Sequence, residues 1–312
     1  MNTVLLSQEI CTQARELLEG KVRILVPQVP GQEEFERLLP EADALILRTN
    51  VRLTAEAVMR AEKLKVVSRT GAGVDNVDID ACRKRGIMIA NTPDANTQSV
   101  VEHTMALALA LSKKLKQYDA AVRLGNWKIR STYASHELYG AMLGIIGYGR
   151  IGRRVARAFQ GTFNMNVIVY DPYLSTDEKG IIVAKSALEV FQQADIVTLH
   201  CPSIPQTRGM VNAELLKEAK RGMLLINCAR GDVVVQDDLI FALMEGSLAG
   251  AGLDVFENEP IKADSPLCGL DNVILTPHSA ALTQEASVRV AVEAARQALT
   301  VLEGGKPEHL IV

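Results

Sequence analysis

Three charged residues in the second half of the chain each follow an apolar run, and together they could move a proton. Arg230 and His278 follow two such runs directly, and Glu259 lies four residues beyond a third that ends at Val255. A histidine can donate and accept a proton near neutral pH, and a carboxylate beside it favours the protonated imidazole and orients the ring. An arginine can polarise a carbonyl and hold a carboxylate. Each residue alone is also an ordinary loop residue, so the prediction depends on the three lying together.

A second candidate site is the segment 143–152, in which an apolar run leads into the pattern G-x-G-x-x-G. Gly147 permits a tight turn, Gly149 lets the backbone approach a pyrophosphate, and Gly152 lets the next helix pack on the strand. The N–H groups at the start of that helix favour a bound phosphate. The alternative is a plain strand–turn–helix connection. The predicted contacts are Gly147, Gly149, Arg150, Ile151 and Gly152.

An acidic residue follows the next apolar run at a spacing typical of a ribose-binding carboxylate. Asp171 follows the run Val167–Tyr170 and lies 19 residues after Gly152. Such a carboxylate can bind the ribose hydroxyls of a dinucleotide. The five residues after Asp171 include no arginine that could meet a 2′-phosphate, which favours NAD over NADP. The alternative role of Asp171 is to cap the turn that follows.

Short apolar runs alternate with amphipathic segments along almost the whole chain, which predicts an α/β fold with parallel sheets. Several runs are apolar at every position, as in strands buried on both faces. The expected strands form two series. The first is Val4–Leu6, Ile24–Val26, Ala44–Leu47, Lys65–Val67 and Ile87–Ala90, and the second is Leu143–Gly147, Val167–Tyr170, Ile196–Leu199, Met223–Asn227, Gly252–Val255 and Val273–Leu275.

Two long helices are also expected. The first begins at a capping box formed by Ser99 and Glu102, and the second covers about residues 283–302. Ligands of open α/β sheets bind at the carboxyl ends of strands, so the three charged residues should converge beside a nicotinamide. Reduction of a ketone puts a hydride on carbon and a proton on oxygen, and His278 suits the proton transfer.

The composition limits the class of protein. The 312 residues include 34 Lys and Arg against 37 Asp and Glu, and 48% are hydrophobic. A net charge of −3 and 4% aromatic residues suit neither phosphate neutralisation nor base stacking, so no nucleic-acid partner is expected. No apolar stretch approaches a membrane span, the N-terminus lacks a signal-peptide pattern, and the five cysteines are scattered. A cytoplasmic protein of about two domains, without membrane contact or metal, is therefore expected.

The order and context of the motifs resemble the D-isomer-specific 2-hydroxyacid dehydrogenases, especially the phosphoglycerate dehydrogenase branch. The resemblance covers nearly the whole chain. It is carried by Gly71–Asp78, Asn91–Pro93, Ser99–His103, Gly147–Gly152, Leu199–Pro202, Asn227–Gly231, Leu253–Pro260 and Thr276–His278. The segment Ser279–Ala281 departs from the family, because many relatives are glycine-rich after the histidine.

The resemblance implies two doubly wound domains with the active site in a cleft between them. A flavodoxin-like substrate domain would comprise residues 1–98 plus 283–312, and a Rossmann NAD-binding domain residues 99–282. The implied catalytic residues are Arg230, Glu259 and His278. Asp254 would contact the nicotinamide carboxamide, and the other implied cofactor contacts are His200, Cys201, Pro202, Thr207, Cys228, Ala229 and His278. The implied substrate contacts are the backbone at Ala72, Gly73 and Val74 together with Arg230 and His278. Family members are usually homodimers joined through the cofactor domains, so a homodimer is expected.

The substrate is expected to be a small anionic 2-hydroxy or 2-keto acid. Arg48 and Arg69 resemble phosphate-contacting arginines of phosphoglycerate dehydrogenases, with a structural role as the alternative. This favours 3-phosphoglycerate, or hydroxypyruvate or glyoxylate, while another acid with a second anion, such as a sulfonated lactate, stays open. The alternative function is an NAD-responsive binding protein like the corepressors of this fold. A formate dehydrogenase is disfavoured, because those relatives carry Gln at the position of Glu259. With the chain ending at Val312, no serine feedback through a C-terminal regulatory domain is expected.

Overall fold

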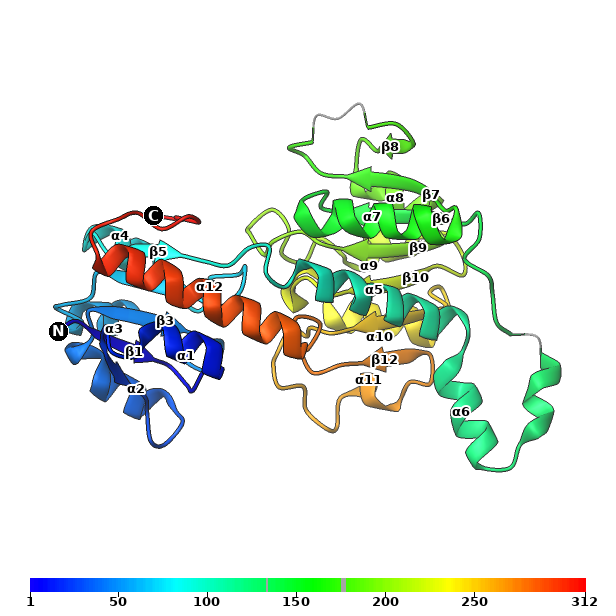
Figure 1. The fold of residues 1–312 in the computed structure, drawn as a ribbon. Helices are drawn as coiled ribbons and strands as arrows, with labels where there is room; N and C mark the ends of the chain where they lie inside the picture. Colours follow the sequence, from blue (N-terminus) through cyan, green and yellow to red (C-terminus); the bar gives the residue numbers. More distant parts are fainter. Residues whose placement is uncertain (133, 175–177) are drawn as a thin grey trace. The chain divides into compact units, whose positions relative to one another are not determined.

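The computed structural model describes residues 1–132, 134–174 and 178–312, which form two compact units. The first unit consists of residues 1–97 and 281–312, and the second of residues 98–280. The chain leaves the first unit after strand β5 (Met88–Ala90) and returns to it as helix α12 (Gln284–Leu302) (Figure 1). The chain passes from one unit to the other at 97/98 and at 280/281.

The first unit is built on a five-stranded, all-parallel sheet in the order β2-β1-β3-β4-β5. Its strands are β1 (Thr3–Leu6), β2 (Arg23–Leu25), β3 (Ala44–Leu47), β4 (Val66–Arg69) and β5. Its helices are α1 (Thr12–Leu18), α2 (Gln32–Leu38), the 3-10 helix η1 (Leu39–Glu41), α3 (Ala55–Arg60), α4 (Ile79–Lys84) and α12. This strand order is that of flavodoxin-like folds.

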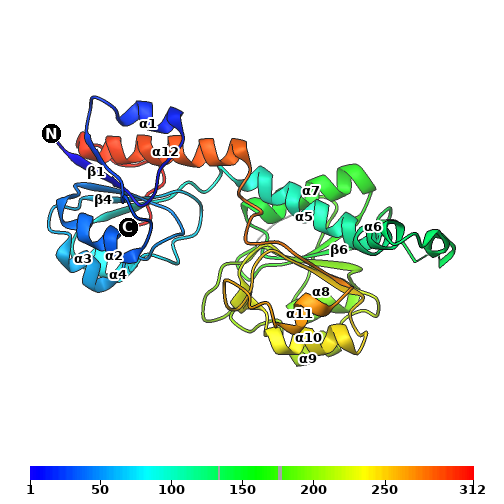
Figure 2. The same cartoon turned by 90° about the horizontal axis from the view of Figure 1, so that it is seen from below.

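Helices cover both faces of this sheet. Helices α1 and α12 lie on one face, and α2, α3 and α4 lie on the other (Figure 2). Val4 and Leu6 of β1 pack on the side of α12, whereas Leu5 packs on the side of α2, where it joins Phe35. Successive side chains of a strand point to opposite faces, so burial of both faces explains why the run is apolar at every position.

The second unit contains a seven-stranded, all-parallel sheet in the order β12-β11-β10-β9-β6-β7-β8. Its strands are β6 (Met142–Ile146), β7 (Asn166–Tyr170), β8 (Ile181–Val183), β9 (Ile196–Leu199), β10 (Leu224–Asn227), β11 (Gly250–Leu253) and β12 (Val273–Leu275). The first six strands of this unit follow the Rossmann order, and β12 extends it at the edge beside β11. The prediction of two doubly wound parallel-sheet domains is confirmed.

Helices again lie on both faces of the second sheet. They are α5 (Thr97–Ser112), α6 (Leu115–Arg123), η2 (Trp127–Thr132), α7 (Arg150–Phe163), α8 (Ala187–Gln193), α9 (Ala213–Lys217), η3 (Gly231–Val233), α10 (Gln236–Met244) and α11 (Pro266–Gly269). Helices α5 and α7 cover one face, and α8, α9 and α10 cover the other (Figure 2). Ile145 of β6 packs with Phe159 of α7, whereas Ile146 packs with Phe191 of α8.

Two local features differ from the expectations. Ser99 does not cap a helix, because α5 begins two residues earlier at Thr97, whose Oγ1 donates to Pro93 O at 3.3 Å. Glu102 instead accepts from Gln98 Nε2 at 2.9 Å, an i,i+4 contact inside the helix. Strand β8 was not expected, since it is a three-residue strand at the sheet edge and is exposed on part of its surface.

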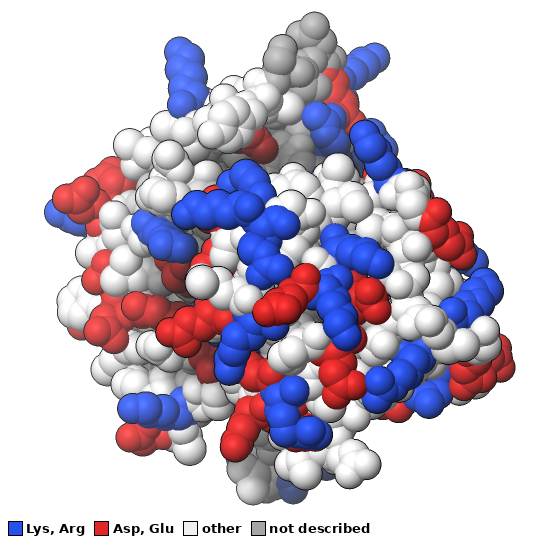
Figure 3. Space-filling view, turned by 90° about the vertical axis from the view of Figure 1, so that its left-hand side faces the viewer, with Lys and Arg blue, Asp and Glu red and all other residues white. Residues whose placement is uncertain are grey.

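Three further observations concern the surface charges, a membrane span and a metal site. On the face drawn in Figure 3, basic and acidic side chains are interspersed. No helix within the described ranges is both long and apolar enough to cross a membrane. The described His, Cys, Asp and Glu residues also include no group of three suited to hold a metal ion.

Candidate functional site

The connection between β6 and α7 is a glycine loop that leaves space for a phosphate. Gly147 has φ +92°, and a Cβ there would lie 2.7 Å from the backbone N of Cys201. A Cβ on Gly152 would lie 2.2 Å from Gly147 O, so glycine is needed for α7 to start this close to the loop. A Cβ on Gly149 would meet nothing within 4 Å, so the loop is open at the start of α7. The first N–H groups of a helix lack acceptors within it, and here they fit a pyrophosphate.

Asp171 follows β7 and is tied to the glycine loop. Its Oδ2 accepts from Tyr148 N at 2.9 Å, and its Oδ1 accepts from Tyr173 N at 3.0 Å. Gly147 N donates to Tyr170 O at 2.9 Å, which joins the loop to the end of β7. Asp171 therefore does cap the following turn, but a carboxylate has further lone pairs that can accept from ribose hydroxyls. The open loop and this carboxylate together fit a bound NAD.

The loop after β9 holds the next predicted cofactor contacts. Burial lowers the pKa of His200 to about 3, and His200 Nε2 lies 2.9 Å from Thr198 Oγ1. Burial also raises the pKa of the Cys201 thiol to about 11. Thr207 Oγ1 donates to Pro202 O at 2.6 Å and closes the turn. These groups are uncharged at neutral pH, so they can line a cofactor site but do not supply a titrating centre.

Glu259 and His278, which follow β11 and β12, form an ion pair in the structure. His278 Nδ1 lies 2.7 Å from Glu259 Oε2, and Phe256 N donates to Glu259 Oε1 at 3.0 Å. Burial of the Glu259 carboxyl opposes its ionisation. The hydrogen bonds from His278 and Phe256 and the positive charges of His278 and Arg230 outweigh that effect and hold the pKa of Glu259 below its usual value. Glu259 is therefore ionised at neutral pH.

An ionised carboxylate only accepts hydrogen bonds, so the contact assigns a proton to His278 Nδ1. The other ring nitrogen, Nε2, is then the atom that can exchange a proton with a ligand. Both side chains keep contact with solvent, at 43% exposure for His278 and 36% for Glu259. The pair is thus accessible to a small molecule, and the contact with Glu259 orients the His278 ring.

The segment after β10 fixes the backbone that carries Arg230. Asn227 Nδ2 donates to Arg230 O at 2.9 Å, and Arg230 Nη1 donates to Ala229 O at 2.7 Å. A Cβ on Gly231 would lie 1.9 Å from the backbone C of Phe256, so only glycine lets this segment pack against the Glu259 loop. The positive charge of Arg230 contributes to the lowered pKa of Glu259. The structure therefore brings Arg230, Glu259 and His278 to one edge of the second sheet.

The other predicted contacts in this segment are neutral groups, of which Cys228 is partly buried and Ala229 is buried. Burial raises the pKa of the Cys228 thiol to about 12, although a hydrogen bond with Thr104 acts in the opposite direction. Ala229 is 7% exposed, and its N–H donates to Asn227 Oδ1 at 3.0 Å. Neither residue offers a charge, which suits a wall against an apolar part of a cofactor.

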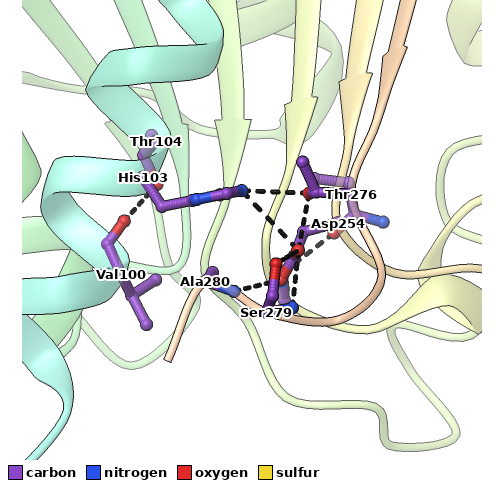
Figure 4. Close-up of polar contacts among 9 residues, drawn as sticks. Val100, His103, Thr104, Asp254, Thr276, Ser279 and Ala280 are labelled. Atoms are coloured by element: carbon purple, nitrogen blue, oxygen red, sulfur yellow. Dashed lines mark hydrogen bonds and ion pairs between the residues drawn. The ribbon is translucent and has the colours of Figure 1, made fainter. Parts of the chain in front are cut away.

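Asp254 is at the centre of a hydrogen-bond network that the sequence did not reveal. Its Oδ1 accepts from Thr276 Oγ1 at 2.6 Å and from Ser279 N at 2.8 Å, and its Oδ2 accepts from Ala280 N at 2.9 Å (Figure 4). His103 of α5 reaches the same network through Thr276. Asp254 is 1% exposed. The sequence signal for Asp254, Thr276 and His103 was their place in the motifs that carry the family resemblance, and it did not show that they meet.

The predicted substrate contacts of the first unit lie in the loop after β4. Gly71 N donates to Thr92 Oγ1 at 2.7 Å, and Asn91 Nδ2 donates to Ala72 O at 2.6 Å. Within the described residues, the N–H groups of Ala72, Gly73 and Val74 have no hydrogen-bond acceptor. Consecutive N–H groups of this kind form an anion-binding concavity.

The two arginines predicted to bind a second anionic group differ in their surroundings. Arg69 is 7% exposed, and its guanidinium donates to Asn76 Oδ1 at 3.3 Å and to Thr70 O. The Arg48 side chain is partly exposed, and its guanidinium has no hydrogen bond or ion pair with any described residue. These contacts favour a structural role for Arg69, and they leave Arg48 able to bind a ligand.

Comparison with known proteins identifies the second unit. Residues 105–280 match the family model described as "D-isomer specific 2-hydroxyacid dehydrogenase, NAD binding domain". The prediction of a Rossmann domain that binds NAD is therefore confirmed.

Relatives and solved structures extend the similarity to the whole chain. The chain is 38% identical to D-3-phosphoglycerate dehydrogenase of Methanocaldococcus jannaschii over 100% of its own length but only 59% of that protein's length. It therefore spans about three fifths of that curated relative. The TT0316 protein of Thermus thermophilus is similar with a TM-score of 0.90 at 33% identity, over 99% of this chain and 100% of that chain. The Aquifex aeolicus D-lactate dehydrogenase, solved with NAD and lactic acid, has a TM-score of 0.86 at 33% identity, over 97% and 96%.

The glycine loop, the strand order and the residues at the sheet edge agree with these similarities along the full chain. The chain belongs to the D-isomer specific 2-hydroxyacid dehydrogenase family.

Proposed function

We propose that this protein is an NAD-dependent oxidoreductase that transfers a hydride between nicotinamide and a small D-2-hydroxy or 2-keto acid. The observation that carries the proposal is the 2.7 Å contact between His278 Nδ1 and Glu259 Oε2, with Arg230 acting electrostatically on the same carboxylate. These residues follow three adjacent strands of the sheet that also holds the glycine loop.

The three side chains have complementary roles in such a reaction. Bound NAD supplies or accepts the hydride. His278 donates the proton on Nε2 to the substrate oxygen during reduction and accepts one from the hydroxyl during oxidation. Glu259 stabilises the charged imidazolium and keeps Nε2 directed away from itself. Arg230 polarises the carbonyl and binds the carboxylate of the same substrate.

The function is tested by initial rates with NADH and a panel of 2-keto acids that includes hydroxypyruvate, glyoxylate and pyruvate, and in the oxidative direction with 3-phosphoglycerate. We expect turnover of at least one, and a loss of kcat of ~10²-fold or more in His278→Ala with NADH binding unchanged. Bound NADH without turnover of any substrate would contradict the enzyme function and favour a binding protein. Normal turnover in His278→Ala would remove this residue from the proton transfer.

We also propose that the enzyme uses NAD rather than NADP, because the Asp171 carboxylate would repel a 2′-phosphate. Asp171→Ala should weaken NAD binding and reduce the discrimination against NADP. The measurement is kcat/KM with each cofactor, and Asp171→Asn separates the charge from the hydrogen bonds. An unchanged preference in the alanine variant would show that the ribose assignment of Asp171 is wrong.

For the substrate, we propose that the N–H groups of Ala72, Gly73 and Val74 receive its carboxylate and that Arg48 binds a second anionic group. The support is that these N–H groups lack acceptors and that the Arg48 guanidinium lacks partners among the described residues. A substrate with two anionic groups, such as 3-phosphoglycerate, suits this set better than a mono-anion. Hydroxypyruvate and glyoxylate need only the carboxylate site.

Arg48→Ala should therefore raise KM for 3-phosphoglycerate by ~10-fold or more, the loss expected for one charge-assisted hydrogen bond. The KM for glyoxylate should change little. The comparison uses kcat and KM for both substrates in the wild type, in Arg48→Ala and in Arg48→Lys, which retains the charge. Equal losses on both substrates would indicate that Arg48 has a structural role.

We further propose that the chain forms a homodimer through the segment α6–η2 of the second unit. Large apolar side chains are exposed here, including Leu124 at 85% and Trp127 at 65%. Figure 1 shows this segment extending away from the sheet of its own unit. Exposed apolar surface of this kind marks a contact with another protein surface, and a second copy is the partner usual in the family.

The oligomeric state is measured by light scattering on a gel-filtration column. The wild type should elute with a dimer mass, and Leu124→Glu with Trp127→Glu should shift it toward a monomer. Met59→Glu in α3, which is also exposed at 72%, is the matched control and should stay dimeric. A wild-type monomer would rule out the homodimer.

A further inference from the structure

A histidine of helix α5 is hydrogen-bonded into the loop that carries His278. His103 Nε2 lies 2.9 Å from Thr276 Oγ1 and 3.6 Å from Asp254 Oδ1. Thr276 follows β12 and Asp254 follows β11, so the contact joins a helix on one face of the sheet to the ends of two strands (Figure 4). The His103 side chain is 22% exposed, so this is a largely buried polar contact.

The hydrogen-bond donors among His103, Thr276 and Asp254 can be assigned. Asp254 accepts from the Thr276 hydroxyl and from the N–H groups of Ser279 and Ala280, an arrangement that suits a carboxylate, which only accepts. The Thr276 proton is therefore directed at Asp254 Oδ1. The remaining lone pairs of Thr276 Oγ1 face His103 Nε2, which must then carry a proton. The chain runs from His103 through Thr276 to Asp254.

The hydrogen bonds that link His103, Thr276 and Asp254 hold the backbone of His278 in an unusual conformation. His278 has φ +51°, a left-handed value that is rare for a residue other than glycine. Its own N–H donates to Asp254 O at 2.8 Å. The residues after it are bound by the Asp254 carboxylate, and Thr276 before it is bound by the same carboxylate and by His103. Strain of this kind persists only where the surrounding contacts over-determine it.

We propose that His103 is a positioning residue for His278: it completes the hydrogen-bond chain through Thr276 that keeps Asp254 and the segment 276–280 in place. The inference rests on the proposed function, because it assigns His103 to the same proton-transfer site. His103 itself does not touch the reacting atoms. Its loss should loosen the His278 loop without removing a proton-transfer group.

Amide hydrogen exchange tests the inference without cofactor or substrate. The Ser279 and Ala280 amides donate to Asp254, so they exchange only when the loop opens. His103→Leu should speed their exchange by ~10-fold or more, whereas His103→Gln, which keeps an N–H donor, should stay near the wild type. His136→Leu is the matched control, because His136 is exposed and uses only its backbone N–H, which donates to Ser112 O. Unchanged exchange in His103→Leu would overturn the inference, and the Ile145 amide in β6 reports any global unfolding.

A double-mutant cycle tests the same chain during turnover. His103→Leu and Thr276→Val each break it, so each should lower kcat by ~10-fold with a smaller effect on the KM for the 2-keto acid. Each should also increase the isotope effect with deuterated NADH. The double variant should be no slower than Thr276→Val alone, because that change already removes the contact with His103 together with the hydrogen bond to Asp254. If the fold-losses in kcat of the two single variants multiply in the double variant, the inference is overturned. An inactive wild type would contradict the proposed function instead, and the exchange experiment would still decide the role of His103.

Discussion

Parallel strands place all of their carboxyl ends at one edge of a sheet, and the candidate site depends on this constraint. Each strand of the second unit returns through a crossover, so the glycine loop after β6 and the residues after β10, β11 and β12 share that edge. The strand order changes direction between β6 and β9, where the connections that follow these two strands diverge to opposite sides of the sheet. A dinucleotide bound at this point would lie beside loops that are far apart in the sequence.

The charges at this edge are arranged so that one ion pair, Glu259 with His278, lies near groups that are neutral. Burial keeps His200, Cys201 and Cys228 neutral at physiological pH. Glu259, by contrast, stays ionised because hydrogen bonds and nearby positive charge outweigh its partial burial. The pair with His278 therefore has a defined proton on Nδ1 and an accessible Nε2. This is the arrangement that reversible proton transfer requires.

Backbone packing gives this pair its geometry. Gly231 packs against the Phe256 backbone more closely than any side chain would allow, and this brings the loops of Arg230 and Glu259 together. Asp254 binds residues on both sides of His278 and holds its left-handed conformation. The buried Asp254 carboxylate, which accepts from three residues, is thus a structural centre of the site.

The sequence by itself determined the fold class, the NAD-binding unit and the identity of the main candidate residues. The signals were local. They were runs that are apolar at every position, which indicate buried parallel strands, the spacing of Gly147, Gly149 and Gly152, and an acidic residue after the next strand. These patterns follow from backbone geometry and burial, which act on residues close in the chain. The resemblance carried by the motifs added the expected role of Asp254, which spacing alone would not assign.

Only the tertiary structure decided which polar groups meet. The start of α5 at Thr97 depends on a contact with Pro93, and β8 depends on its pairing with β7, so neither was predicted. Arg48 and Arg69 look alike as sequence features, yet one guanidinium is bound within its own unit and the other has no partner among the described residues. His103 and Thr276 are separated by 173 positions and meet only because α5 packs over the ends of β11 and β12. Contacts of this kind are set by the packing of whole elements, and the order of residues along the chain does not encode them in any local pattern.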